Sequence, residues 1–134
     1  MRKGSSLETK INKLIDHVDG NGYFAQRNHP RRSLDGRFLE GEKFDYIIVT
    51  PTQRLAFDAK ECHADKWRFT DKEIRQANNL KKCKNSGFEA FFLIYFFTAQ
   101  KLLAFDVDVF AAALKEGRKY LTQDEGSEWS WTNF

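Results

Sequence analysis

The residues best suited to chemistry are two aspartates and a lysine in the middle of the chain. Asp58 and Lys60 stand two positions apart in a β-forming segment, so both side chains project from the same face of a strand. Asp45 opens the preceding β-forming segment. If the turn between the segments has an even number of residues, Asp45 lies opposite Asp58, with about 4.5–5.5 Å between their Cβ atoms. The pattern therefore predicts two carboxylates that can share one cation.

Hard carboxylate oxygens at this spacing favour magnesium, which keeps several waters and accepts a phosphate oxygen. Such a metal polarises a phosphate and activates water, while Lys60 orients that water or stabilises charge on phosphorus. A second interpretation stays open, because two aspartates at strand ends with a lysine nearby also occur by chance. The apolar residues beside both aspartates favour the metal site, since a charge at the edge of an apolar strand is costly unless it is paired or metal-bound.

The residues around these positions resemble a known nuclease pattern. The segments Phe44–Tyr46 and Phe57–Cys62 resemble the PD-(D/E)XK nuclease superfamily, and within it the RecU-type Holliday junction resolvases. Those resolvases have an Asp-Tyr pair, then Phe-Glu-Ala-Lys-Glu-Thr at the same separation, and a glutamine on the following helix that Gln76 matches. The early helix around Glu8 and the apolar strand Phe91–Ile94 also match, so the similarity covers roughly residues 4–107.

This resemblance implies a metal-dependent endonuclease that cleaves branched DNA, above all four-way junctions, in recombination and repair. It implies that Asp45 and Asp58, together with the Ala59 carbonyl, hold Mg²⁺, with Mn²⁺ as a substitute. Lys60 and Gln76 would complete the catalytic site. We also expect a homodimer, because a two-fold symmetric substrate suits a two-fold symmetric pair of sites.

Some features qualify the resemblance. Asp58 replaces the glutamate usual in these resolvases, which the wider superfamily allows, and Phe44 stands where they have a small hydroxyl residue. The connection 28–43 is shorter than the protruding stalk of these resolvases, which is thought to enter the junction. Glu8 is a candidate outer carboxylate, although it also fits a capping box with Ser5 at the start of the first helix.

The elements that must position these residues follow from the spacing of apolar residues. The sequence predicts helices at 5–20, from Thr70 to Cys83 and at 109–115, and strands at 23–27, 45–49, 54–58, 90–97 and 102–107. Thr70 and Glu73 form a capping box for the second helix. The order α-β-β-β-α-β-β-α predicts an α/β fold, a mixed central sheet flanked by helices, and the resemblance implies that this is a restriction-endonuclease-like core.

The composition agrees with one globular domain, residues 1–134. Of 134 residues, 41% are hydrophobic and 31% are charged, which favours neither a disordered nor a membrane protein. Residues 121–134 form an acidic tail, with Trp129 and Trp131, that the sequence does not place. Cys62 and Cys83 are expected to be reduced, and no signal peptide is visible, so we expect a cytoplasmic protein of a bacterial or phage-infected bacterial cell.

Positive charge is concentrated before residue 85, which suits a polyanion bound by one face, although a charge run is also often a solvated surface. Trp67 fits either stacking on a base or core packing.

Two alternative functions stay open: a nuclease of the same fold that acts on flaps, replication intermediates or duplex, and a non-catalytic DNA-binding module. RNA binding has no motif to support it. The candidate DNA contacts are Arg31, Arg32, Lys66, Arg68, Lys72, Arg75, Lys81 and Lys82.

Overall fold

A computed structural model of the chain describes residues 5–27, 44–131 and 134. The connection 28–43, with Arg31 and Arg32, lies outside the described residues, and so does the side chain of Ser5. The elements are α1 (Ser5–Gly20), β1 (Phe24–Arg27), β2 (Tyr46–Val49), β3 (Arg54–Cys62), β4 (Lys66–Arg68), α2 (Asp71–Asn85), β5 (Glu89–Phe96), β6 (Lys101–Asp106), α3 (Val107–Lys115), β7 (Tyr120–Thr122), the 3-10 helix η1 (Gln123–Glu125) and β8 (Ser127–Glu128).

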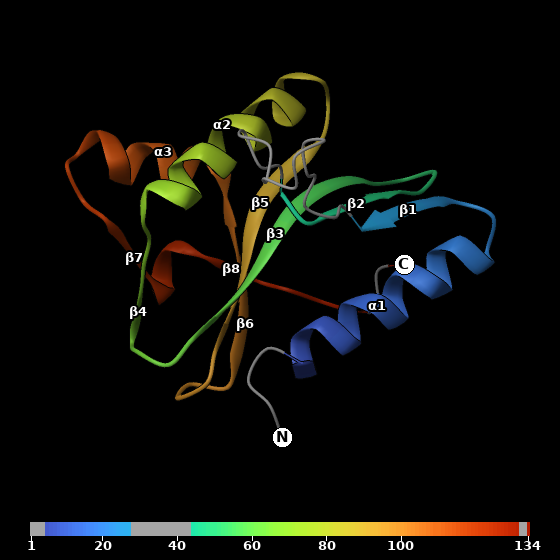
Figure 1. The fold of residues 1–134 in the computed structure, drawn as a ribbon, viewed down its shortest axis with the longest axis horizontal. Coiled ribbons are helices and arrows are strands. Elements are labelled where there is room, and N and C mark those ends of the chain that lie inside the picture. Colours follow the sequence, from blue (N-terminus) through green and yellow to red (C-terminus); the bar gives the residue numbers. More distant parts are fainter. Residues whose placement is uncertain (1–4, 28–43, 132–133) are drawn as a thin grey trace, which may run out of the picture.

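Six strands of the described chain form the main sheet, in the order β1-β2-β3-β5-β6-β8. Strands β3 and β5 run parallel, and the other neighbours run antiparallel. Helix α1 lies on one side of the sheet, and α2 and α3 lie on the other (Figure 1). The predicted mixed sheet flanked by helices is therefore confirmed. The connection from β3 to β5 crosses over through α2, as parallel neighbouring strands require.

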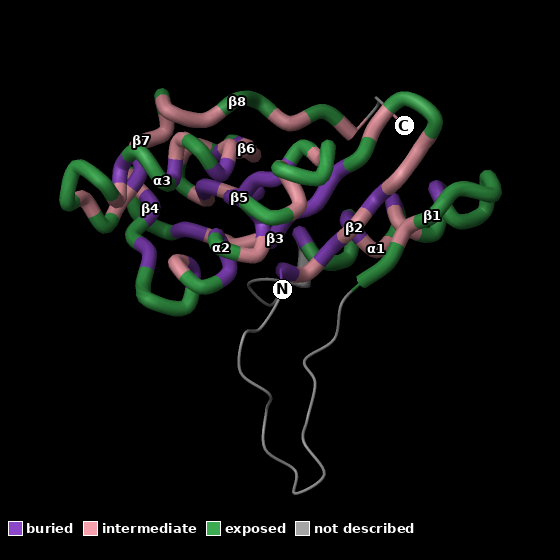
Figure 2. Tube along the Cα trace, turned by 90° about the horizontal axis from the view of Figure 1, so that it is seen from above, coloured by how far each residue is buried: buried purple, intermediate pink, exposed green. Residues whose placement is uncertain are grey.

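Strand β3 separates two hydrophobic cores, because its side chains alternate between the two faces of the sheet. Leu55 and Phe57 pack with α1, while Ala56 and Cys62 pack on the side of α2 and α3. Buried positions follow the central strands, and exposed ones lie mainly in the turns and on the outer sides of the helices (Figure 2). A polar residue in the middle of β3, such as Asp58, is therefore buried.

Helix α2 begins as the sequence predicts. The backbone N–H of Thr70 donates to Glu73 Oε1 at 2.8 Å, which completes the predicted capping box. Helix α3 begins at Val107, two residues earlier than predicted, because the Asp106 side chain accepts a hydrogen bond from the backbone N–H of Asp108 at 2.8 Å and caps the helix.

The C-terminal segment, which the sequence does not place, packs on both layers of the fold. Strand β7 pairs with β4 in a small second sheet, and β8 extends the main sheet beside β6. Trp129 packs against Phe57 and Phe91, with ring centroids 5.7 and 5.5 Å apart. Trp67 is buried among the phenylalanines of the other core, so the interpretation as a base-stacking residue is wrong.

Two further sequence features have a simple outcome. Cys62 and Cys83 are free thiols, as expected. Within the ranges that the structure covers, each helix is too short or too polar to cross a lipid bilayer.

Candidate active site

Asp45 and Asp58 meet across the β2–β3 hairpin. Val49 pairs with Arg54, which leaves an even number of residues in the turn, and the register places Asp45 beside Asp58. The backbone N–H of Asp45 donates to Asp58 Oδ1 at 3.1 Å. The structure thus brings the two carboxylates together on one face, as their spacing predicts.

Asp58 lies at the centre of the cluster. Its side chain is fully buried, and Gln76 Nε2 on α2 donates to its Oδ1 at 3.2 Å. Lys60 Nζ lies 2.9 Å from Asp58 Oδ2, an ion pair whose alignment is not that of a normal hydrogen bond. The predicted residues Asp45, Asp58, Lys60 and Gln76 therefore form one contiguous site between the sheet and α2. Their catalytic roles, and that of the Ala59 carbonyl, remain predictions.

The site is electrostatically unbalanced. Burial, together with the charge and hydrogen bonding of Asp58, raises the pKa of Asp45 to about 7. Burial by itself would lower the pKa of Lys60, but the carboxylates of Asp58, Glu73 and Asp45 raise it above its ordinary value. Lys60 therefore stays protonated at neutral pH, while Asp45 has too little positive charge nearby to hold its pKa in the usual range of a carboxyl group.

The oxygens of this cluster fit a hard divalent cation. Asp58 Oδ2 and Gln76 Oε1 are buried, and neither accepts a hydrogen bond within the described part of the chain. Buried oxygens of this kind are costly unless a donor or a metal satisfies them. Among the described residues no group of three or more His, Cys, Asp or Glu side chains forms a metal site, so a cation beside the aspartate pair would need other oxygens, such as the Ala59 carbonyl that the resemblance implies or the buried Gln76 amide oxygen.

Glu8 lies on the other side of the sheet from these ligands. It is exposed on α1. Burial raises the pKa of Glu61 and of Tyr46, and the charge of Glu8 adds a smaller contribution in the same direction. Tyr46 packs in the core under α1, and Glu61 alternates with Lys60 along β3. An outer carboxylate role for Glu8 therefore remains a prediction without a contact in support.

One residue of the cluster escaped the sequence analysis. Glu73 is buried on α2, and its Oε2 lies 3.5 Å from Lys60 Nζ. The capping box already explains why a glutamate stands at position 73, so that pattern provides no reason to expect its contact with Lys60. The sequence did contain one indication that Glu73 belongs to the site. It stands three residues before Gln76, so both side chains lie on the same face of the helix.

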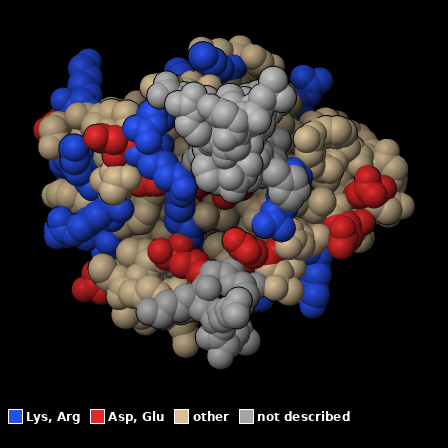
Figure 3. Space-filling model, viewed as in Figure 1, with Lys and Arg blue, Asp and Glu red and all other residues tan. Residues whose placement is uncertain are grey.

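Most of the candidate DNA contacts within the described residues are exposed, and two have a partner of known geometry. Lys and Arg side chains gather on the part of the viewed face that α2 occupies (Figure 3). On α2 itself, Lys72, Arg75 and Lys82 are exposed. Arg68 is exposed on β4. Lys81 already forms an ion pair of 2.7 Å with Asp108, and Lys66 Nζ lies 4.2 Å from the centre of the Tyr120 ring.

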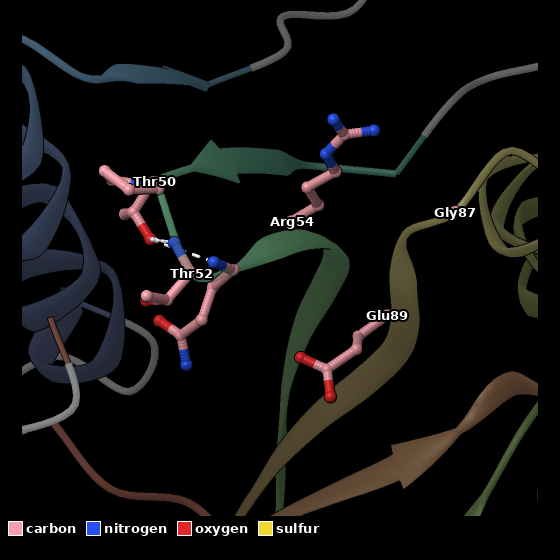
Figure 4. Close-up of a pocket in the computed structure, with 7 residues that line it drawn as sticks. Thr50, Thr52, Arg54, Gly87 and Glu89 are labelled. Carbon is pink, nitrogen blue, oxygen red and sulfur yellow. Dashed lines mark hydrogen bonds between the residues drawn. The ribbon is translucent and has the colours of Figure 1, made fainter.

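A polar pocket of about 480 Å³ lies at the far end of the hairpin from the aspartate pair. Thr50 Oγ1 accepts hydrogen bonds from the backbone N–H groups of Thr52 and Gln53, and this closes the turn (Figure 4). The side chains of Arg54 and Glu89, also in the lining, point in different directions (Figure 4). The pocket contains none of the predicted catalytic residues, so it is separate from the candidate active site.

Together, the mixed sheet and the Asp–Asp–Lys–Gln cluster at its centre define a nuclease-like α/β fold of the restriction-endonuclease type. Residues 2–129 match the family model of recombination protein U (RecU). The chain belongs to this family, and the family prediction made from the sequence is confirmed.

The structure search supports the same fold. The chain resembles the structure of Archaeoglobus fulgidus Hjc, described as a Holliday junction resolvase from an archaeal hyperthermophile, with a TM-score of 0.59 over 90% of this chain and 94% of that one. At 15% sequence identity this likeness concerns the fold. No curated protein sequence matches the chain.

Proposed function

We propose that this protein is a Holliday junction resolvase: a Mg²⁺-dependent endonuclease that cleaves phosphodiester bonds in four-way DNA junctions as a homodimer. Membership of the recombination protein U family supports the resolvase class. The observation that carries the metal dependence is the pairing of the partly buried Asp45 with the fully buried Asp58, whose electrostatic imbalance a divalent cation would relieve.

In this proposal, Asp45, Asp58 and the Ala59 carbonyl hold the cation, and the buried amide oxygen of Gln76 is available as a further ligand. When bound, the cation would supply positive charge for the phosphate in the transition state and lower the pKa of a water. Gln76 also fixes the orientation of Asp58 through its 3.2 Å hydrogen bond. Lys60, kept protonated by its carboxylate neighbours, provides a positive charge for the phosphate and does not act as a base.

The exposed basic residues of α2 and β4 supply contacts to the DNA backbone. Such contacts position a nucleic acid without reading its sequence, and their affinity falls steeply with salt. Lys72, Arg75, Lys82 and Arg68 are suited to this role because they are exposed on or beside the helix that carries Gln76. A homodimer would present two such sites to the paired strands of a junction.

The test compares a synthetic four-way junction with linear duplexes of the same sequences, at one salt concentration, in Mg²⁺ or in EDTA. We expect paired nicks in the junction with Mg²⁺, no cutting in EDTA and little cutting of duplex. Sedimentation should give about twice the chain mass of 15.7 kDa. Equal cutting of duplex would favour a nuclease with other targets. Junction binding without cutting, in Mg²⁺ and in Mn²⁺, would favour a non-catalytic module.

A further inference from the structure

Lys60 is held between two carboxylates that come from different layers of the fold. Asp58 Oδ2 on the same strand lies 2.9 Å from its Nζ, and Glu73 Oε2 on α2 lies 3.5 Å from it. The Lys60 side chain is only 22% exposed. Because lysine has a long, flexible side chain with many rotamers, a contact from one side would leave its ammonium group free to move.

Glu73 is itself fixed, and its two oxygens have separate partners. Its Oε1 accepts hydrogen bonds from the backbone N–H and the hydroxyl of Thr70, both at 2.8 Å. Its Oε2 faces Lys60. Burial would raise the pKa of Glu73, but the hydrogen bonds from Thr70 and the charge of Lys60 hold it below its usual value, so Glu73 is ionised.

We propose that Glu73 is a positioning residue for the reaction: it holds the ammonium of Lys60 at the aspartate pair and so links the docking of α2 to catalysis. The inference rests on the proposed nuclease function, in which Lys60 supplies charge to the phosphate. Glu73 contacts neither substrate nor metal in this role. Misplacing a charged group by about 1 Å costs up to 10²-fold in rate, so a loose Lys60 weakens the chemical step rather than DNA binding.

The competing explanation is that Glu73 only caps α2. Glu73→Gln separates the two roles, because a glutamine keeps the oxygen that accepts from Thr70 but replaces the anionic oxygen that faces Lys60 with a neutral amide. Asp71→Asn is the matched control. It removes the same charge from the same helical turn, but the Asp71 side chain is 79% exposed and lies 3.7 Å from Lys119.

The experiment measures single-turnover cleavage and binding of a four-way junction, together with thermal melting, for both variants. We expect Glu73→Gln to lower the cleavage rate about 10-fold, with Kd and melting temperature close to those of Asp71→Asn. Asp71→Asn should cleave within about twofold of the unmodified protein. Equal rates for the two variants, or a rate loss explained entirely by unfolding, would overturn the proposal.

A second readout needs neither metal nor DNA. Competitive acetylation followed by peptide mass spectrometry compares the reactivity of Lys60 with that of exposed Lys10. Lys60 should become several-fold more reactive in Glu73→Gln and stay unchanged in Asp71→Asn. Unchanged reactivity in both would overturn the contact. If the unmodified protein cleaves no junction while Lys60 responds in this way, the proposed nuclease function fails and the Glu73–Lys60 contact stands without a catalytic role.

Discussion

Two lysines of this protein each lie between two carboxylates, in opposite surroundings. Lys84 Nζ lies 2.7 Å from both Asp106 Oδ1 and Asp108 Oδ2, on side chains that are 32–48% exposed. Lys60 has a similar arrangement beside Asp58, which is fully buried. In the exposed cluster water can solvate the remaining oxygens, whereas in the buried cluster a carboxylate oxygen is left without a hydrogen bond.

The difference indicates what each cluster does. The Lys84 cluster joins α2 to the start of α3, where Asp106 also caps the helix, so its role is structural. In the buried cluster, burial and the charge of Asp58 raise the pKa of Asp45 to about 7. A purely structural ion pair does not require such an unfavourable environment for a carboxylate. Perturbed carboxylates beside a fixed cation are typical of functional sites, which supports the proposal that Lys60, rather than Lys84, serves the chemistry.

The strongest test of this comparison replaces one carboxylate of each cluster. Asp58→Asn should lower junction cleavage by about 10³-fold or more, because metal stabilisation is worth several kcal/mol and about 4 kcal/mol is a factor of 10³. Junction binding by gel shift should be retained. Asp108→Asn, the matched change in the exposed cluster, should cleave normally. Comparable losses in both variants would remove the distinction between the clusters.

A stability measurement sharpens the comparison without DNA. Asp45 titrates near 7 in the folded protein and near 3.8 when unfolded, so between these values the folded state binds the extra proton. The free energy of unfolding in EDTA should therefore fall as pH rises from about 4 to 7. Asp45→Asn removes this loss and should be more stable at pH 8 by on the order of 2 kcal/mol, with little difference at pH 4.

Denaturant unfolding of both proteins across this pH range gives the answer. Adding Mg²⁺ at pH 8 should stabilise the unmodified protein more than Asp45→Asn, because ligands that bind the folded state shift its stability. If the difference in free energy of unfolding between the two proteins stays constant from pH 4 to 8, the folded structure does not raise the pKa of Asp45.

The smallest effect concerns the exposed cluster. Lys84→Ala should lower the free energy of unfolding by less than about 1 kcal/mol, and less still in high salt, because exposed ion pairs are weak and screened. Its cleavage rate should stay within about twofold. A large loss of cleavage after Lys84→Ala, measured on the folded protein, would show that the surface cluster also serves the active site.

Local patterns were sufficient for much of the fold. The capping box of Thr70 and Glu73 marks the start of α2, and the long apolar run marks β5. Short strands β4, β7 and β8 were missed because their stability comes from pairing with segments distant in sequence, as Trp67 does opposite Leu121. Three residues or fewer carry too little periodicity to predict a strand.

For the active site, the sequence determined that Asp45 pairs with Asp58 if the turn has an even number of residues, because a hairpin is a local structure whose register follows from the length of its turn. The pairing of Val49 with Arg54 meets that condition. It also placed Lys60 on the same face, since strand side chains alternate. Only the tertiary structure decided that Asp58 would be fully buried, that Gln76 would reach it and that Glu73 would meet Lys60. Those contacts depend on how α2 docks on the sheet, and docking is set by the packing of whole layers rather than by the spacing of neighbouring residues.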